Sequence, residues 1–133
     1  MEQLFLKINI YSNIYLIAIS IMVQLIIYPS FKNYYNSNFR SFHSSYTKKM
    51  FFIVGPIMIL ELLSTIYLAI KNSDFFPTSI VVLIWLTTFF LIVPVHNSLN
   101  SAFSIKTHKK LLYLNFTRTT FWVLKLLSLI HIS

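Results

Sequence analysis

The apolar positions of the chain fall into four long stretches, at about 8–28, 50–70, 79–99 and 111–131. As helices that rise about 1.5 Å per residue, all four are long enough to cross a hydrocarbon core of about 30 Å. The first stretch ends in Tyr28-Pro29 rather than in small residues, so we expect a retained span and not a cleaved signal peptide. The pattern predicts an all-α fold with one domain, residues 1–133: an integral membrane four-helix bundle with up-down topology.

The segment 31–49, between the first two stretches, is also predicted to be helical. Its aromatic residues are four, four, three and four positions apart, which places them on one helix face: Phe31, Tyr35, Phe39, Phe42 and Tyr46. Residues 36–38 are of N-cap type, so a helix that begins there would extend the second span into the cytoplasm. A separate helix lying in the membrane interface is the alternative. Gly55-Pro56 and Pro94 are expected to bend or locally break the second and third spans.

Composition agrees with a membrane protein. Of the residues, 56% are hydrophobic and only 11% are charged, with a mean hydropathy of +0.70, which excludes an ordinary water-soluble domain. The net charge of +8 comes from basic residues in short segments between apolar stretches, so we expect a lipid bilayer and no nucleic acid as the partner. The chain has no cysteine, which excludes disulfides, thiolate nucleophiles and Cys-ligated metals.

The basic residues are distributed unevenly between the segments that link the spans. The loop after the first span and the loop after the third span hold most of them: Lys32, Arg40, Lys48, Lys49, Lys106, Lys109 and Lys110. The other side has only Lys7 and Lys71. The positive-inside rule therefore predicts that both basic loops lie in the cytoplasm and both termini outside. We expect a bacterial cytoplasmic membrane as the location.

Ionisable residues inside spans are functional candidates, because charge inside a bilayer is costly. Glu61 is the acidic residue of the second span, while Asn115, Arg118, Trp122 and Lys125 share one face of the fourth. Counted from the cytoplasmic ends, Glu61 lies about 16 Å deep, Arg118 about 10 Å and Lys125 about 21 Å. We favour a pair between Glu61 and Arg118, because a guanidinium can hold a carboxylate with two hydrogen bonds and lysine can snorkel outward. An ion pair that only fixes helix register is the alternative.

The third span ends in Pro94-Val95-His96-Asn97-Ser98-Leu99-Asn100, where His96 and Asn100 face the same way. His96 is a candidate general base or a metal or haem ligand, and a histidine that simply hydrogen-bonds a neighbouring helix is the alternative. A metal set of His43, His96 and Glu61, or haem between the two histidines, is a weaker hypothesis, since no diagnostic spacing supports it. No cofactor can be assigned from these residues.

Polar residues of several spans gather at one level in the cytoplasmic half: Gln24, His96, Asn97, Asn115 and Arg118. Lipid would penalise each of them, so they indicate either a pocket that opens toward the cytoplasmic leaflet or the cytoplasm, or a hydrogen-bonded core without a ligand.

Two short segments, 94–99 and 115–119, together with Trp122, resemble the closing half of the anthrone-oxygenase-like small four-span membrane proteins. The resemblance covers about the last 40 residues, and His96 stands where that family usually has Asn. It implies a cofactor-independent oxygenase, or a relative of one, that acts on a lipophilic aromatic substrate.

Three functions remain open. In the first, a membrane-embedded enzyme acts on a lipophilic small molecule, with catalytic His96, Glu61 and Arg118 and with substrate-binding Asn97, Asn100, Asn115, Trp122, Gln24 and Tyr46. In the second, a non-catalytic subunit or assembly factor uses Phe39 and Phe42 to dock a membrane-protein partner. In the third, a transporter or channel subunit uses Glu61 as a proton or cation site. A chain this small has little room for a private cavity, so a homo-oligomer is a further hypothesis.

Overall fold

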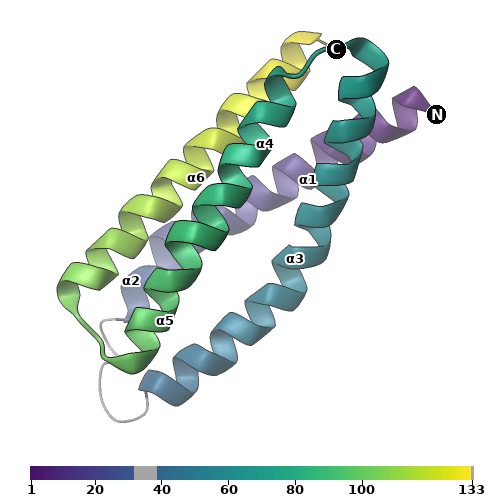
Figure 1. Ribbon diagram of the computed structural model, residues 1–133. Helices are drawn as coiled ribbons and strands as arrows, with labels where there is room; N and C mark the ends of the chain where they lie inside the picture. The colour runs from purple at the N-terminus through teal and green to yellow at the C-terminus, as the bar shows by residue number, and fades with distance from the viewer. Residues whose placement is uncertain (32–38, 133) are drawn as a thin grey trace.

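The computed structural model describes residues 1–31 and 39–132, which form four long helical rods (Figure 1). The first rod consists of α1 (Glu2–Met22), a π-helical turn η1 (Val23–Ile27) and α2 (Tyr28–Ser30). The second is α3 (Phe39–Asn72). The third consists of α4 (Phe76–Thr87), a second π-helical turn η3 (Thr88–Ile92) and α5 (Val93–Ser101), and the fourth is α6 (Ile105–Ile132). The described residues contain no strand, so the all-α prediction is confirmed.

Three of the rods are long and apolar enough to cross a membrane: Glu2–Ser30, Phe39–Asn72 and Phe76–Ser101. The rod α6 has the length, but its polar residues lower its hydropathy. In space α1 packs along α3 and α6, and α4 packs along α6 (Figure 1). Both termini lie at the end of the bundle where α3 connects to α4, and the start of α3 and the connection from α5 to α6 lie at the opposite end.

The second rod confirms that the aromatic segment continues directly into the second span. It runs without interruption from Phe39 to Asn72, although Pro56 lies inside it. Gly55-Pro56 therefore does not break the helix. The N-cap candidates at 36–38 and the aromatic residue Tyr35 lie outside the described residues.

Proline distorts the first and third rods in the same way. The turn η3 ends two residues before Pro94, and η1 ends two residues before Pro29. Proline has no N–H to donate to the carbonyl four residues before it, and its ring clashes with that carbonyl in a regular α-helix. The wider π turn displaces the carbonyl and so relieves the clash. Both irregular turns contribute side chains to the pocket described below.

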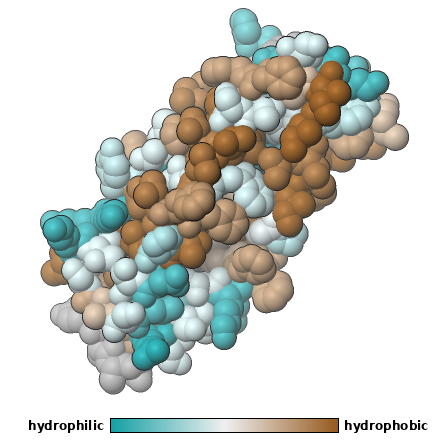
Figure 2. Space-filling view, viewed as in Figure 1, coloured by the Kyte–Doolittle hydropathy of each residue, from teal (hydrophilic) through white to brown (hydrophobic). Residues whose placement is uncertain are grey.

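The interior of the bundle contains many polar side chains beside its apolar core, and the outer flanks are apolar. Twelve polar or charged side chains are buried among the described residues: Asn9, Ser12, Asn13, Ser20, His43, Glu61, Ser64, Thr65, Thr87, His108, Asn115 and Lys125. Large apolar side chains such as Leu25, Ile70 and Phe90 are exposed on the flanks. Figure 2 shows hydrophobic residues along the middle of the visible face and hydrophilic residues toward its ends. This distribution is that of a membrane-embedded bundle.

Candidate functional site

The interior polar residues form three groups along the bundle, and the predicted cluster at one level divides between two adjoining groups, which meet where Arg118 contacts the Tyr28 hydroxyl. Glu61 lies in a group nearest the termini. Gln24, Asn115 and Arg118 form a middle group. His96 lies in a third group nearest the basic end. Asn97 is exposed, but it lines the same pocket as His96.

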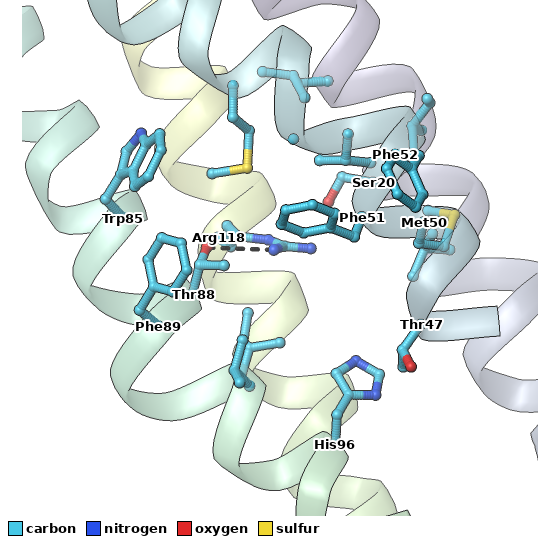
Figure 3. Close-up of a pocket in the computed structure, with 18 of the residues that line it drawn as sticks. Ser20, Thr47, Met50, Phe51, Phe52, Trp85, Thr88, Phe89, His96 and Arg118 are labelled. Carbon is cyan, nitrogen blue, oxygen red and sulfur yellow. Dashed lines mark hydrogen bonds between the residues drawn. The ribbon is translucent and has the colours of Figure 1, made fainter. Parts of the chain in front are cut away.

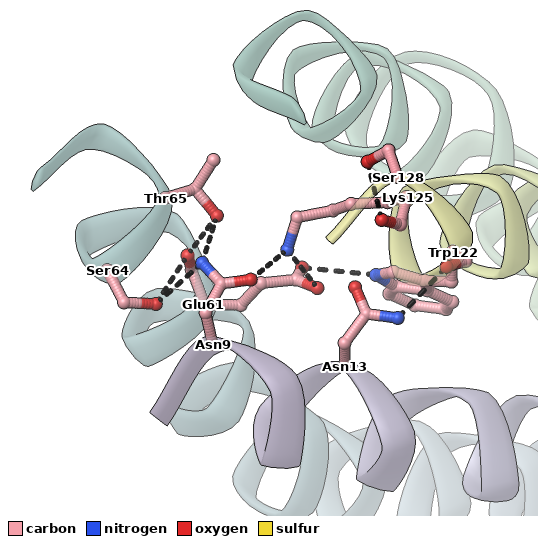
Figure 4. A network of polar contacts seen from close by, with 8 residues as sticks. All are labelled: Asn9, Asn13, Glu61, Ser64, Thr65, Trp122, Lys125 and Ser128. Atoms are coloured by element: carbon pink, nitrogen blue, oxygen red, sulfur yellow. Dashed lines mark hydrogen bonds and ion pairs between the residues drawn. The ribbon is translucent and has the colours of Figure 1, made fainter. Parts of the chain in front are cut away.

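The first group centres on a fully buried ion pair between α3 and α6. The ammonium Nζ of Lys125 lies 3.0 Å from Oε2 of Glu61, and both side chains have 0% exposure. The indole N–H of Trp122 donates to the other carboxylate oxygen, Oε1, at 3.1 Å. Lys125 also donates to Oδ1 of Asn9 on α1, at 2.8 Å. Three helices are thereby joined at one point (Figure 4).

The hydrogen bonds of this group extend beyond the ion pair. The amide N–H group of Asn9 donates to the hydroxyls of Ser64 and Thr65, which in turn donate to the backbone carbonyl of Glu61. The amide of Asn13 donates to the backbone carbonyl of Trp122 at 2.9 Å. Nearly every polar atom here has a partner, as a group inside a bilayer requires.

The prediction that Glu61 pairs with Arg118 is therefore wrong, and so is the prediction that Lys125 snorkels to the interface. Both cations lie within about 6 Å of the depth of the carboxylate, so helical rise alone did not distinguish them. The packing of α6 against α1 and α3 brings Lys125 and Trp122 to the two carboxylate oxygens. No place remains at Glu61 for the guanidinium.

In the middle group, Arg118 contacts neutral partners. Its Nη2 donates to Oδ1 of Asn115 at 2.8 Å, and its Nη1 donates to Oγ1 of Thr88 at 3.4 Å. The guanidinium carbon lies 5.1 Å from the centre of the Trp122 ring. Its Nε is buried and has no hydrogen-bond partner among the described residues. Asn115 is held in turn by the side chain of Gln24, which accepts a hydrogen bond at 2.9 Å.

The third group is a chain of hydrogen bonds from α2 through α5 to α3. The hydroxyl of Tyr28 lies 3.1 Å from Nε2 of His96, and Nδ1 of His96 lies 2.8 Å from Nε2 of His43. The chain ends where Nδ1 of His43 lies 2.7 Å from Oδ1 of Asn100. The prediction that His96 and Asn100 face the same way is confirmed, since both contact His43.

The acceptor at the end of this chain determines the direction of every bond in it. Oδ1 of Asn100 only accepts, so Nδ1 of His43 carries the hydrogen and Nε2 of the neutral ring accepts. His96 must then donate from Nδ1, which leaves its Nε2 as the acceptor for the Tyr28 hydroxyl. The lone pair of His96 therefore faces Tyr28.

The metal and haem sites considered from the sequence are not formed by the described residues. Glu61 lies 18 positions after His43 on the same helix, about 27 Å along its axis, and is bound to Lys125. No group of three or more His, Cys, Asp or Glu side chains in the described parts of the chain is placed to hold a metal ion. The rings of His43 and His96 are 4.9 Å apart and hydrogen-bonded, so no haem iron fits between them.

A pocket with a volume of about 620 Å³ lies where α3 faces the third rod. Of the predicted site residues, Tyr46, His96, Asn97, Asn100, Arg118 and Trp122 line it, while Gln24, His43, Glu61 and Asn115 do not. Its other walls are largely apolar. In Figure 3, Arg118 lies between Phe51 on α3 and Phe89 on η3. Because these two rings are 65% and 50% exposed, the pocket reaches the apolar flank of the bundle.

Several residues of these groups were not identified from the sequence. In the sequence, Tyr28 is an aromatic residue at the end of a span, a common position that indicates no specific role. The spacing of three polar residues on the first rod could have been used to find them. Together with Gln24 they lie at offsets 0, 4, 11 and 15, which is one helix face: Asn9, Asn13 and Ser20. Buried His108 also has a structural role, since its Nε2 donates to the backbone carbonyl of Tyr28 at 2.6 Å and ties α6 to α2.

Comparison with known proteins adds no relative: no family model, no curated protein and no solved structure matches this chain. The functional conclusion therefore rests on the geometry of the chain itself.

We predict that Lys125→Met lowers the free energy of unfolding by about 3–5 kcal/mol, because it leaves the Glu61 carboxylate buried without a counter-charge. The double variant Glu61→Gln/Lys125→Met should recover most of that loss. Equilibrium unfolding in mixed detergent micelles measures both. Lys110→Met, at an exposed lysine of the same helix, is the control. A Lys125→Met protein as stable as this control would contradict the prediction.

We also predict the tautomers of the histidine chain. Nitrogen-15 NMR of histidine-labelled protein should show His43 and His96 protonated at Nδ1 and unprotonated at Nε2. In His43→Phe, His96 loses its acceptor and its Nδ1 preference should disappear. An Nε2-protonated His96 in the unsubstituted protein would overturn the direction of the chain.

Proposed function

We propose that the protein is a four-span membrane enzyme that takes a lipophilic small molecule from the bilayer into the pocket between α3 and the third rod. The single observation that carries this proposal is the pocket itself. Its walls are apolar and reach the exposed flank of the bundle, yet it brings Arg118 and His96 to its interior surface. A concave apolar site with a few convergent polar groups is the usual form of a small-molecule site.

The distribution of side chains on α6 supports its role as the fourth span. Asn115, Trp122 and Lys125 are buried inside the bundle, at 0%, 1% and 0% exposure. The opposite face presents apolar side chains such as Phe116 and Leu127. A helix that turns the charges of its apolar stretch, Arg118 and Lys125, toward the bundle can lie in lipid although its mean hydropathy is modest.

The charges at the two ends of the bundle support the proposed orientation. The end with the termini holds Lys7 and Lys71 together with the acidic Glu2 and Asp74. The described basic residues of the two loops, Arg40, Lys48, Lys49, Lys106, Lys109 and Lys110, lie toward the opposite end, which we place in the cytoplasm of a bacterial cell.

We propose that His96 acts as the general base. Its Nε2 lone pair is directed at the Tyr28 hydroxyl, and Tyr28 lines the pocket. When a bound ligand gives up a proton to the Tyr28 oxygen, the Tyr28 proton passes to His96 Nε2, and the imidazolium is held by His43. The electron pair stays on the ligand, which thereby becomes a monoanion whose charge Arg118 balances. The resemblance to anthrone-oxygenase-like proteins agrees with an enzyme that acts on a lipophilic aromatic substrate.

The geometry supports the two other functions less. Phe39 is 3% exposed and packs against Phe31 and Phe103, so it is not a free docking residue for a partner. Glu61 is bound by Lys125 and Trp122 and does not line the pocket, which gives a transport site there no support.

The topology can be tested because the chain has no cysteine of its own. We expect a cysteine at Asn72, or one added after Ser133, to react with a membrane-impermeant maleimide on intact bacterial cells. A cysteine at Ser104 should react only after permeabilisation. If the added C-terminal cysteine behaved like the one at Ser104, α6 would not cross the membrane.

The enzymatic proposal predicts that His96→Asn reduces turnover by about 100-fold or more, since general-base catalysis contributes about 10²–10⁴-fold. Lipid-soluble extracts of cells that express the unsubstituted protein should lack a compound that accumulates in His96→Asn cells. Ser98→Ala, at an exposed position of the same helix outside the pocket, is the control. Identical extracts from folded His96→Asn protein and from unsubstituted protein would argue against catalysis.

A further inference from the structure

We infer that the ligand of the pocket is a lipophilic monoanion, a carboxylate or phenolate on an apolar body, with its charged oxygens on Arg118. This inference rests on the proposed function only in that the pocket must take up a lipophilic molecule. It adds the chemical class of that molecule.

The charges of the bundle interior leave Arg118 uncompensated. The chain has three acidic side chains, Glu2, Glu61 and Asp74. Glu61 is paired with Lys125, and the other two lie at the end of the bundle where the termini are. The hydrogen-bonding partners of Arg118 are the amide of Asn115 and the hydroxyls of Thr88 and Tyr28, all neutral. A guanidinium in this setting carries a full positive charge that no protein carboxylate balances, and a monoanion balances it one to one.

The hydrogen bonds of the guanidinium point to the same ligand. The guanidinium contacts the oxygens of Thr88, Asn115 and Tyr28, and its Nε is buried without any partner in the described part of the chain. A buried N–H without an acceptor is rare in folded proteins. Arginine binds a carboxylate through two parallel N–H donors, so an oxyanion in the pocket would meet unused donors of this side chain.

The side chains around Arg118 indicate the polarity and size of the rest of the ligand. Beside the guanidinium the pocket is walled by Met58, Trp85 and Phe89, and it reaches the lipid-facing flank at Phe51 and Phe52. A volume of about 620 Å³ suits one small ligand. A molecule with one charged head and an apolar body can enter from the bilayer, leave its body among these side chains and place its head on Arg118.

Quenching of tryptophan fluorescence tests the inference, because both tryptophans of the chain, Trp85 and Trp122, line the pocket. Dibromostearic acid is the probe, since bromine quenches indole fluorescence, and its methyl ester is the matched neutral compound. In nanodiscs at neutral pH, we expect the acid to quench with an affinity at least about tenfold higher than the ester, as charge-assisted hydrogen bonds would provide.

Variants distinguish the possible outcomes. Arg118→Gln should remove the preference for the acid, Arg118→Lys should keep part of it, and the surface variant Lys110→Gln should not change it. Gly55→Leu serves as a pocket-filling variant, because a Cβ on Gly55 would meet only the side chain of Phe51, at 3.9 Å. It should weaken quenching by both compounds.

Two results would overturn the inference in different ways. Saturable quenching with equal affinities for acid and ester, reduced in Gly55→Leu, would leave the pocket as a lipophile site and refute the anionic ligand. Quenching by neither compound, or quenching that Gly55→Leu does not change, would refute the lipophile-binding pocket and with it the proposed function. The comparison of acid with ester in the unsubstituted protein needs no variant to fold.

Discussion

The ion pair between Glu61 and Lys125 is the constraint on which the rest of the bundle depends. Inside a bilayer an unpaired carboxylate or ammonium is costly, so α3 and α6 must lie in the one register that joins these two groups. Asn9 completes the coordination of the ammonium, and α1 is thereby placed as well. Trp122 donates to the second carboxylate oxygen, so both oxygens of Glu61 have partners and neither is available to another cation. A polar junction of three helices thus defines the half of the bundle nearest the termini.

The register of α3 and α6 also determines which interior cation has no carboxylate partner. Since Lys125 neutralises Glu61, Arg118 lies two turns away on the same helix without a carboxylate, next to the pocket between α3 and the third rod. The ion pair and Arg118 therefore lie on one face of α6: the ion pair fixes the position of the helix, and Arg118 is the interior cation, among the described residues, that it leaves without a carboxylate. We therefore expect substitutions in the ion pair to change stability, and substitutions of Arg118 to change binding of the proposed ligand.

Much of the fold was predictable from the sequence, and the pairing within it was not. Apolar stretches indicated the four rods, and the N-cap residue types at 36–38 indicated a helix that runs into the second span, as α3 does from Phe39. The alignment of His96 with Asn100 followed from their spacing of four. The partner of Glu61 did not follow, because helical rise brings Arg118 and Lys125 equally close in depth and only the contacts between helices distinguish them. The role of Tyr28 was equally unpredictable, since no residue near it in the sequence indicates a contact with His96, 68 positions later.

The two prolines connect the irregular backbone to the site. Tyr28 directly precedes Pro29, and His96 follows Pro94 by two residues, so each end of the Tyr28–His96 hydrogen bond lies beside a proline preceded by a π turn. Thr88, which accepts a hydrogen bond from Arg118, begins the second of these turns. A π turn adds a residue to the helical repeat and so changes which side chains face the pocket. The helix distortions that proline imposes on two different rods thereby direct Tyr28, His96 and Thr88 to one cavity, where regular helices would present other side chains.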